Sequence, residues 1–158
     1  MIDKTIAPEE LFELRKNRIP VVTQEKKSGR ILGLNLTDKS AFDKTLETGE
    51  CHYYDDVNDM IYLKGEHSGE VETILEIRWD QCHARRHEAH LLYIVDMAEG
   101  KCKFGVNDCH FFLYQDGKFV FDRDMIKDPS AVTEFKERIE TFLTPEEDDQ
   151  HKKRFKKD

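Results

Sequence analysis

The sequence contains no long apolar run and no apolar segment of the kind found in secretory leaders. We therefore expect neither contact with a membrane nor export, and interpret the four cysteines as free thiols of a cytoplasmic protein. An excess of positive charge is also lacking, since the formal net charge is −8. Nucleic-acid phosphates would be repelled by such a protein, and this argues against nonspecific binding to nucleic acid.

No internal repeat divides the 158 residues, and this length suits one domain that buries a core without disulfides. We predict a single domain over residues 1–144. Residues 145–158 are almost wholly charged, and we predict that they form a disordered, solvated tail.

The apolar pattern predicts an α+β fold, in which a mostly antiparallel β-sheet is flanked by a few helices. Pro8 opens one short helix, and Thr37 or Asp38 caps a second that ends near Thr48, because Gly49 suits a left-handed C-terminal position. A last helix is predicted from Asp128. The predicted strands are 19–22, 30–36, 50–55, 60–64, 71–79, 91–95, 110–114 and 118–121.

In two of these elements the spacing of apolar residues predicts which side chains share a face. In the second helix, one apolar face is expected to consist of Ala41, Phe42, Thr45 and Leu46. In the strand 71–79, strict alternation is expected to separate Val71, Thr73, Leu75, Ile77 and Trp79 from Glu72, Ile74, Glu76 and Arg78.

Metal-binding residue types concentrate between residues 79 and 110. This stretch contains three cysteines and four histidines, namely Cys82, Cys102, Cys109, His83, His87, His90 and His110. Thiolate and imidazole suit zinc better than magnesium or calcium. A catalytic zinc takes three protein ligands and keeps a fourth position for water, so the three cysteines match that count.

Three motifs follow one another in the sequence: Thr45–Tyr54 (TLETGECHYY), Lys64–Gly69 (KGEHSG) and Glu76–Asp80 (EIRWD). In this order they resemble the signatures of phosphoribosyl-AMP cyclohydrolase, the enzyme of histidine biosynthesis that opens the adenine ring by hydrolysis between N1 and C6. The resemblance covers roughly residues 20–112. It implies a compact, mostly antiparallel β fold and a homodimer whose zinc is held by cysteines from both sides of the interface.

The resemblance also implies roles for single residues. Cys102 and Cys109 match the family's cysteine pair, Cys82 resembles the third zinc ligand after Asp80, and His52 matches the family's histidine. Zinc would lower the pKa of a bound water that attacks C6 of a purine nucleotide. The candidates for moving a proton to N1 are His52, Glu66 and His110, and those for substrate binding are Lys64 and Ser68.

Two departures from the family pattern concern the substrate and a second metal. Residues 55–59 (DDVND) replace an arginine-containing run suited to phosphate. The family's aspartate-rich magnesium motif is interrupted after Asp80 by an insertion with histidines. Asp80 and the histidines His83, His87 and His90 are candidate metal ligands, and imidazole suits zinc, iron or nickel better than magnesium. Arg85 with Arg86 offers a relocated phosphate clamp.

Alternative interpretations stay open for these residues. His83, His87 and His90 are also consistent with a solvated polar rim or with proton transfer, and Arg85 and Arg86 with an exposed loop. The Lys64–Gly69 motif is also explained as a turn in which two glycines supply unusual backbone angles, and Cys51 as a small buried residue.

We expect a zinc-dependent homodimeric hydrolase that acts on phosphoribosyl-AMP or a related purine nucleotide, with a second divalent cation, magnesium or a transition metal, in the histidine-rich insertion. One alternative is a diverged zinc hydrolase or deaminase acting on another nucleotide or nucleobase. Another is a zinc-stabilised dimer that binds a nucleotide or a protein without turnover.

Overall fold

The computed structural model describes residues 5–66, 69–80, 88–97, 110 and 112–122. The chain divides into two compact units, Met1–Glu99 and Gly100–Asp158. None of the helices within the described ranges is long and apolar enough to cross a membrane. The predicted helix from Asp128 and the predicted tail at 145–158 lie outside the described residues and stay predictions.

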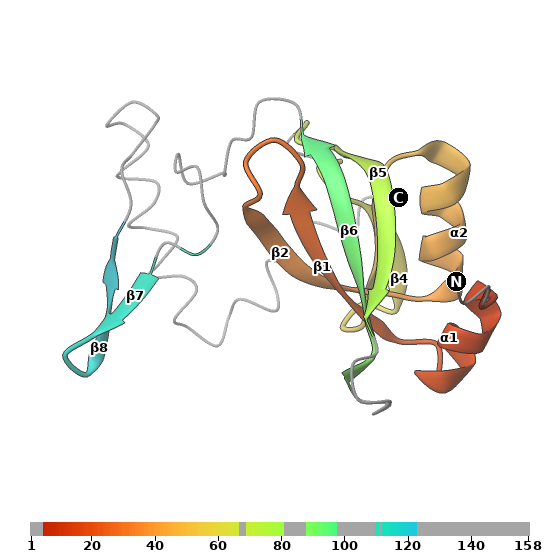
Figure 1. Ribbon diagram of the computed structural model, residues 1–158, viewed down its shortest axis with the longest axis horizontal. Helices are drawn as coiled ribbons and strands as arrows, with labels where there is room; N and C mark the ends of the chain where they lie inside the picture. Colours follow the sequence, from red (N-terminus) through yellow and green to blue (C-terminus); the bar gives the residue numbers. More distant parts are fainter. Residues whose placement is uncertain (1–4, 67–68, 81–87, 98–109, 111, 123–158) are drawn as a thin grey trace. The chain divides into compact units, whose positions relative to one another are not determined.

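The first unit is built on one six-stranded sheet (Figure 1). The strand order is β4-β3-β2-β1-β6-β5, and every pairing is antiparallel except that of β1 with β6. This confirms the predicted α+β fold with a mostly antiparallel sheet. The elements are α1 Pro8–Leu14, β1 Ile19–Glu25, β2 Ile31–Thr37, α2 Lys39–Thr48, β3 His52–Asp55, β4 Met60–Leu63, β5 Glu72–Asp80 and β6 His90–Met97.

The sheet curls until its edge strand β5 reaches the segment that leads into β3. The Cys51 N–H donates to the Glu72 carbonyl over 2.9 Å, and the Ile74 N–H donates to the Gly49 carbonyl over 2.9 Å. These hydrogen bonds satisfy backbone groups at the start of β5 that would otherwise stand at an open sheet edge. The curled sheet therefore encloses the side chains on its inner face.

Both ends of α2 follow the sequence signals. Asp38 is the N-cap, and its carboxylate accepts a hydrogen bond from the Ala41 N–H over 2.7 Å. Gly49 ends the helix in the left-handed conformation, with φ at 75°, and its N–H donates to the Thr45 carbonyl over 2.9 Å. The predicted buried face is confirmed except at Leu46, which is 56% exposed. Leu46 lies about 100° around the helix from Thr45, and this turns it away from the sheet.

Strand β5 departs from the predicted strict alternation. Its pairing with β6 shifts register between Ile74 and Glu76, and Leu75 at this bulge is 54% exposed. A bulge adds one residue to a strand and reverses the phase of the residues that follow. The inward side chains therefore belong to both predicted faces, since Glu72 is buried and Ile74, Ile77 and Trp79 pack against the core.

The core lies between the inner face of the sheet and the two helices. Figure 1 shows α1 and α2 beside each other next to the strands, and Phe12 of α1 meets Phe42 of α2 edge to face, with ring centroids 5.3 Å apart. Two tyrosines inside the sheet, Tyr53 and Tyr93, stack at 6.1 Å. The buried side chains that pack together as the core are Leu11, Phe12, Ile19, Val21, Phe42, Cys51, Tyr53, Ala89, Leu91, Tyr93 and Val95.

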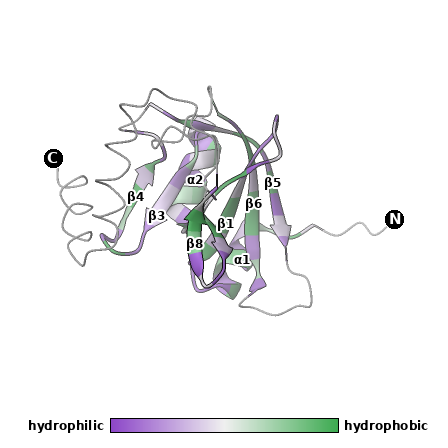
Figure 2. Cartoon of the chain, turned by 90° about the vertical axis from the view of Figure 1, so that its left-hand side faces the viewer, coloured by the Kyte–Doolittle hydropathy of each residue, from purple (hydrophilic) through white to green (hydrophobic). Residues whose placement is uncertain are grey.

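The second unit contains the predicted hairpin, formed by β7 Phe112–Gln115 and β8 Lys118–Phe121. Asp116 and Gly117 make its turn with φ of 50° and 81°, the positive angles that a tight hairpin turn requires. Hydrophobic colour dominates β8 in Figure 2, and the side chains of Phe119 and Val120 are exposed.

Candidate functional site

The loop between β4 and β5 carries the motif Lys64–Gly69 and is held at both ends. Gly65 has a φ of 83°, and a Cβ atom placed there would lie 2.2 Å from the Glu70 carbonyl oxygen. Gly69 has a φ of 78°, and its N–H donates to the Gly65 carbonyl over 2.8 Å. The unusual backbone angles predicted for these glycines are confirmed. Their geometry presents Lys64 and Glu66, both exposed, from a defined turn.

His52 begins β3 next to this loop, since it pairs with Leu63, the residue before Lys64. Its ring is buried, and Nδ1 lies 2.8 Å from the Glu50 carbonyl oxygen. A carbonyl oxygen can only accept, so Nδ1 carries the proton and Nε2 keeps its lone pair in the neutral ring. The His52 N–H also donates to the Thr45 hydroxyl over 2.9 Å. His52 is thus oriented as a proton acceptor through Nε2.

Asp80 and His90, both predicted metal ligands, are brought together where β5 ends and β6 begins. They are register partners, and Asp80 Oδ2 lies 3.7 Å from His90 Nε2. His90 Nδ1 lies 2.8 Å from the Glu88 carbonyl oxygen. With Nδ1 donating, the Nε2 lone pair faces a carboxylate oxygen. The space between two such acceptors suits a proton or a bound cation.

A buried polar cluster inside the curled sheet was not predicted from the sequence. The Tyr53 hydroxyl donates to Glu72 Oε1 over 3.1 Å and lies 2.8 Å from the Thr23 hydroxyl. The Tyr53 hydroxyl has a single hydrogen and donates it in the bond to Glu72, so in the second bond the Thr23 hydroxyl donates to the Tyr53 oxygen. Cys51, fully buried as expected, also lies against Tyr53 and Glu72. The sequence signal that could have revealed the cluster is Glu72, because it lies on the same face of β5 as the inward-facing Ile74.

Burial controls the ionisation of this cluster. Burial raises the pKa of the Glu72 carboxyl, while the Lys64 charge and the Tyr53 hydrogen bond oppose that rise. Burial and the Glu72 charge raise the pKa of the Cys51 thiol to about 12 and that of the Tyr53 hydroxyl well above its usual range. At neutral pH the thiol and the phenol therefore stay protonated, and Glu72 is the member that can carry charge.

The acidic segment after Tyr54 is used by the β3–β4 turn. Asp55 is buried, and its carboxylate accepts from the Val57 N–H over 2.9 Å and from the Asn58 side-chain amide over 2.8 Å. The Tyr54 hydroxyl donates to Asp59 over 2.5 Å. The carboxylates of Asp55 and Asp59 thus serve as local hydrogen-bond acceptors in the segment where the resemblance would place arginines.

The remaining predicted site residues are placed as follows. His110 is exposed and belongs to the Gly100–Asp158 unit. Within the described parts of the chain, no three His, Cys, Asp or Glu side chains gather closely enough to hold a metal ion. The predictions that lie outside the described residues are Ser68, Cys82, His83, Arg85, Arg86, His87, Cys102 and Cys109.

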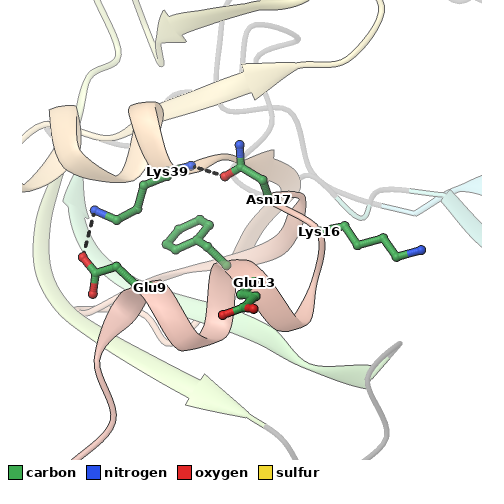
Figure 3. Close-up of a pocket in the computed structure, with 6 residues that line it drawn as sticks. Glu9, Glu13, Lys16, Asn17 and Lys39 are labelled. Carbon is green, nitrogen blue, oxygen red and sulfur yellow. Dashed lines mark hydrogen bonds and ion pairs between the residues drawn. The ribbon is translucent and has the colours of Figure 1, made fainter.

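A cavity of about 490 Å³ lies beside α1 and the start of α2 (Figure 3). The Lys39 ammonium at its rim pairs with Glu9 at 3.5 Å, and the Lys39 N–H donates to the Asn17 side chain over 2.9 Å. None of the predicted site residues that the structure describes lines this cavity. It is therefore separate from the candidate site at Lys64, His52 and Glu72.

Comparison with known proteins identifies similar chains. The family model described as phosphoribosyl-AMP cyclohydrolase matches residues 34–111. The chain is 34% identical to the phosphoribosyl-AMP cyclohydrolase of a Polaromonas species over 120 residues, which cover 74% of this chain and 90% of that protein. It is 36% identical to the enzyme of the same name from Haloquadratum walsbyi over 126 residues, 78% of this chain and 89% of that one. A histidine biosynthesis bifunctional protein of Aquifex aeolicus is 36% identical over 94 residues, which cover 59% of this chain and 43% of that protein.

Proposed function

The chain belongs to the phosphoribosyl-AMP cyclohydrolase family of histidine biosynthesis, and from this we propose that it hydrolyses phosphoribosyl-AMP, or a related purine nucleotide, between N1 and C6. The observation that carries the proposal is the glycine-locked loop at Lys64–Gly69 beside the oriented ring of His52. The loop offers a cation and a carboxylate at its surface, and His52 offers a base. Both belong to a chain that aligns with nine tenths of the Polaromonas enzyme.

His52 is proposed to manage the proton of the reaction. In the overall change a water adds to C6, the bond between N1 and C6 breaks, and N1 takes up a proton. Nε2 of His52 is the ring nitrogen left free by the bond at Nδ1, so it can take the proton of the water and return it at N1. Glu66 and His110 are the alternative proton carriers, since both are exposed. Lys64 and Ser68 are proposed to bind the nucleotide.

The zinc ligands are proposed to be Cys82, Cys102 and Cys109, shared between the subunits of a homodimer. Three thiolates and an open fourth position are the donor set of a catalytic zinc, so this chain's residues fit the ion. When bound, zinc acts as a Lewis acid that lowers the pKa of water towards neutrality. We place this enzyme in the cytoplasm, where the thiols stay reduced.

A second divalent cation is proposed at the stem of the histidine-rich insertion. Asp80 and His90 already face each other at 3.7 Å, and His83 and His87 lie within the insertion. A site with imidazole ligands suits a transition metal better than magnesium. Arg85 and Arg86 are proposed to contact the substrate phosphate from the same insertion.

A second candidate function is hydrolysis or deamination of another nucleotide or nucleobase. The acidic β3–β4 turn favours it, because Asp55 and Asp59 stand where the resemblance would place phosphate-binding arginines. A panel of purine nucleotides and nucleobases separates the two functions, since each predicts turnover of a different member.

The test measures zinc content and turnover of phosphoribosyl-AMP on one purified sample. We expect about one zinc per chain and turnover that follows it. Cys109→Ala should lose zinc, dimer and activity, because a missing ligand opens the metal site. Cys51→Ala is the matched control, since Cys51 is buried against Tyr53 and should leave the zinc content unchanged. Full zinc and activity in Cys109→Ala would refute the ligand assignment, and zinc without turnover of any panel member would leave a non-catalytic binding dimer.

A further inference from the structure

Two threonines of α2 hold the segment that leads from the helix to His52, and they do so by the same three contacts. The Thr48 hydroxyl donates to the carbonyl four residues earlier in the helix over 2.9 Å, accepts from the Glu50 N–H over 3.1 Å and lies 3.3 Å from the Glu50 carbonyl oxygen. The Thr45 hydroxyl also donates to the carbonyl four residues earlier, over 3.0 Å. It accepts from the His52 N–H over 2.9 Å and lies 3.3 Å from the His52 carbonyl oxygen.

The spacing of the two threonines matches the spacing of the backbone groups that they bind. Side chains three positions apart lie on one face of a helix, and N–H groups two positions apart in an extended segment point to the same side. The N–H of Cys51, between the two bound residues, points to the other side and donates to the Glu72 carbonyl over 2.9 Å. Three successive N–H groups, at residues 50–52, are therefore held alternately by α2 and by β5.

The Glu50 carbonyl held in this way is the group that orients the His52 ring. His52 Nδ1 lies 2.8 Å from this oxygen. In a neutral imidazole, the partner of one ring nitrogen decides which nitrogen carries the proton. The position of the His52 proton therefore depends on where the Glu50 carbonyl is kept, and the threonine contacts keep it there.

We propose that Thr45 and Thr48 are positioning residues that keep the proton of the neutral His52 ring on Nδ1, so that Nε2 can accept a proton. The inference rests on the proposed function, in which His52 moves the proton of the reaction. Both threonines act through the backbone of Glu50 and His52. A neutral imidazole without a partner at Nδ1 favours the tautomer protonated on Nε2 in water, and that tautomer has no acceptor at Nε2. The proposal also explains the spacing of threonines and histidine in the motif Thr45–Tyr54.

His90 has the same ring contact and supplies an internal reference. It begins β6, and its Nδ1 lies 2.8 Å from the carbonyl oxygen of Glu88, two residues earlier. The residue between histidine and carbonyl is small and fully buried in both places, Cys51 before His52 and Ala89 before His90. The two histidines therefore have the same local arrangement, on different elements of the fold.

The first experiment needs no substrate and determines the His52 tautomer from the ring-nitrogen NMR shifts of the full chain, in mildly alkaline solution where histidine is neutral. The variant is Thr48→Val, because Thr48 is exposed and valine keeps its shape without the hydroxyl. We expect the ratio of the Nδ1–H to the Nε2–H tautomer at His52 to fall about three- to tenfold, the size of one hydrogen bond. The ratio at His90 should not change, and Thr48→Ser should restore the wild-type ratio at His52. An unchanged His52 ratio in Thr48→Val, or an equal change at His90, would overturn the proposal.

The second experiment measures amide hydrogen exchange and includes the fully buried Thr45. Thr48→Val should speed exchange of the Glu50 N–H, and Thr45→Val that of the His52 N–H, each about three- to tenfold. The Cys51 N–H is the matched control in both variants, because it donates to β5. Equal acceleration of all three amides would show a general loss of stability and would overturn the proposal. Thr48→Val alone decides the proposal if Thr45→Val does not fold.

Turnover of phosphoribosyl-AMP is measured separately on Thr48→Val and Thr48→Ser. We expect kcat of Thr48→Val to fall by about the same factor as the tautomer ratio, with KM nearly unchanged, and Thr48→Ser to keep the wild-type kcat. An unchanged kcat with a changed tautomer would overturn the proposal that the tautomer serves the reaction. A wild type that shows the tautomer effect but does not turn over phosphoribosyl-AMP would refute the proposed function and leave the positioning of His52 intact.

Discussion

Substitution of Gly65 by alanine tests whether the Lys64 loop is built on a close backbone approach. Two costs arise from the structure. The φ of 83° is unfavourable for any residue with a Cβ atom, at about 1 kcal/mol. The Cβ atom would also lie 2.2 Å from the Glu70 carbonyl oxygen, and relieving an overlap with backbone costs about 1–3 kcal/mol more. The expected loss in the free energy of unfolding is therefore about 2–4 kcal/mol.

Gly69→Ala is the matched control for this prediction. Gly69 has nearly the same angle, 78°, but a Cβ atom there would have no neighbour within 4 Å among the residues that the structure describes. It should cost only the conformational term of about 1 kcal/mol. The assay is urea unfolding of both variants, with the slope checked for a two-state transition. Equal losses in the two variants would refute the argument that Gly65 is required by the approach of Glu70.

Two further predictions concern stability. Glu72→Gln should become more stable relative to the wild type as pH rises from 4.5 to neutral. The Glu72 carboxyl has a raised pKa in the folded state, so it stabilises the fold below its unfolded pKa and loses that contribution as pH rises through its folded pKa, whereas glutamine does not titrate. Urea unfolding at several pH values measures the difference in the free energy of unfolding, and a difference independent of pH would contradict the prediction. Asp38→Ala should cost about 1 kcal/mol, because it removes the cap that accepts from the Ala41 N–H. Asp43→Ala, on the exposed side of the same helix, is its control, and equal losses in thermal unfolding would contradict the cap assignment.

The elements that the sequence predicted well depend on neighbouring residues. Helix α2 starts at Asp38 and ends at Gly49 because capping and left-handed geometry involve only a few positions along the chain. The hairpin turn at Asp116–Gly117 follows from the same kind of local preference. The family resemblance also rested on short motifs, and the comparisons confirmed it.

The elements that the sequence missed depend on partners far along the chain. The parallel pairing of β1 with β6 joins segments about 70 residues apart, for which no local pattern exists. The roles of Cys82, Cys102 and Cys109 and of the inserted histidines stay predictions, because they lie outside the described residues. Asp80 and His90 were both named as metal ligands, but only pairing of β5 with β6 brings them to 3.7 Å.

Strand β5 shows most clearly which features follow from the sequence alone and which follow from tertiary pairing. Its composition was enough to predict a strand beginning near residue 71, because alternation of apolar and polar residues is a local property. Which residues face inward was decided by the bulge at Leu75, and a bulge exists only relative to the partner strand β6. That shift places Glu72 inside, hydrogen-bonded to Tyr53, so the buried carboxylate is a product of tertiary pairing.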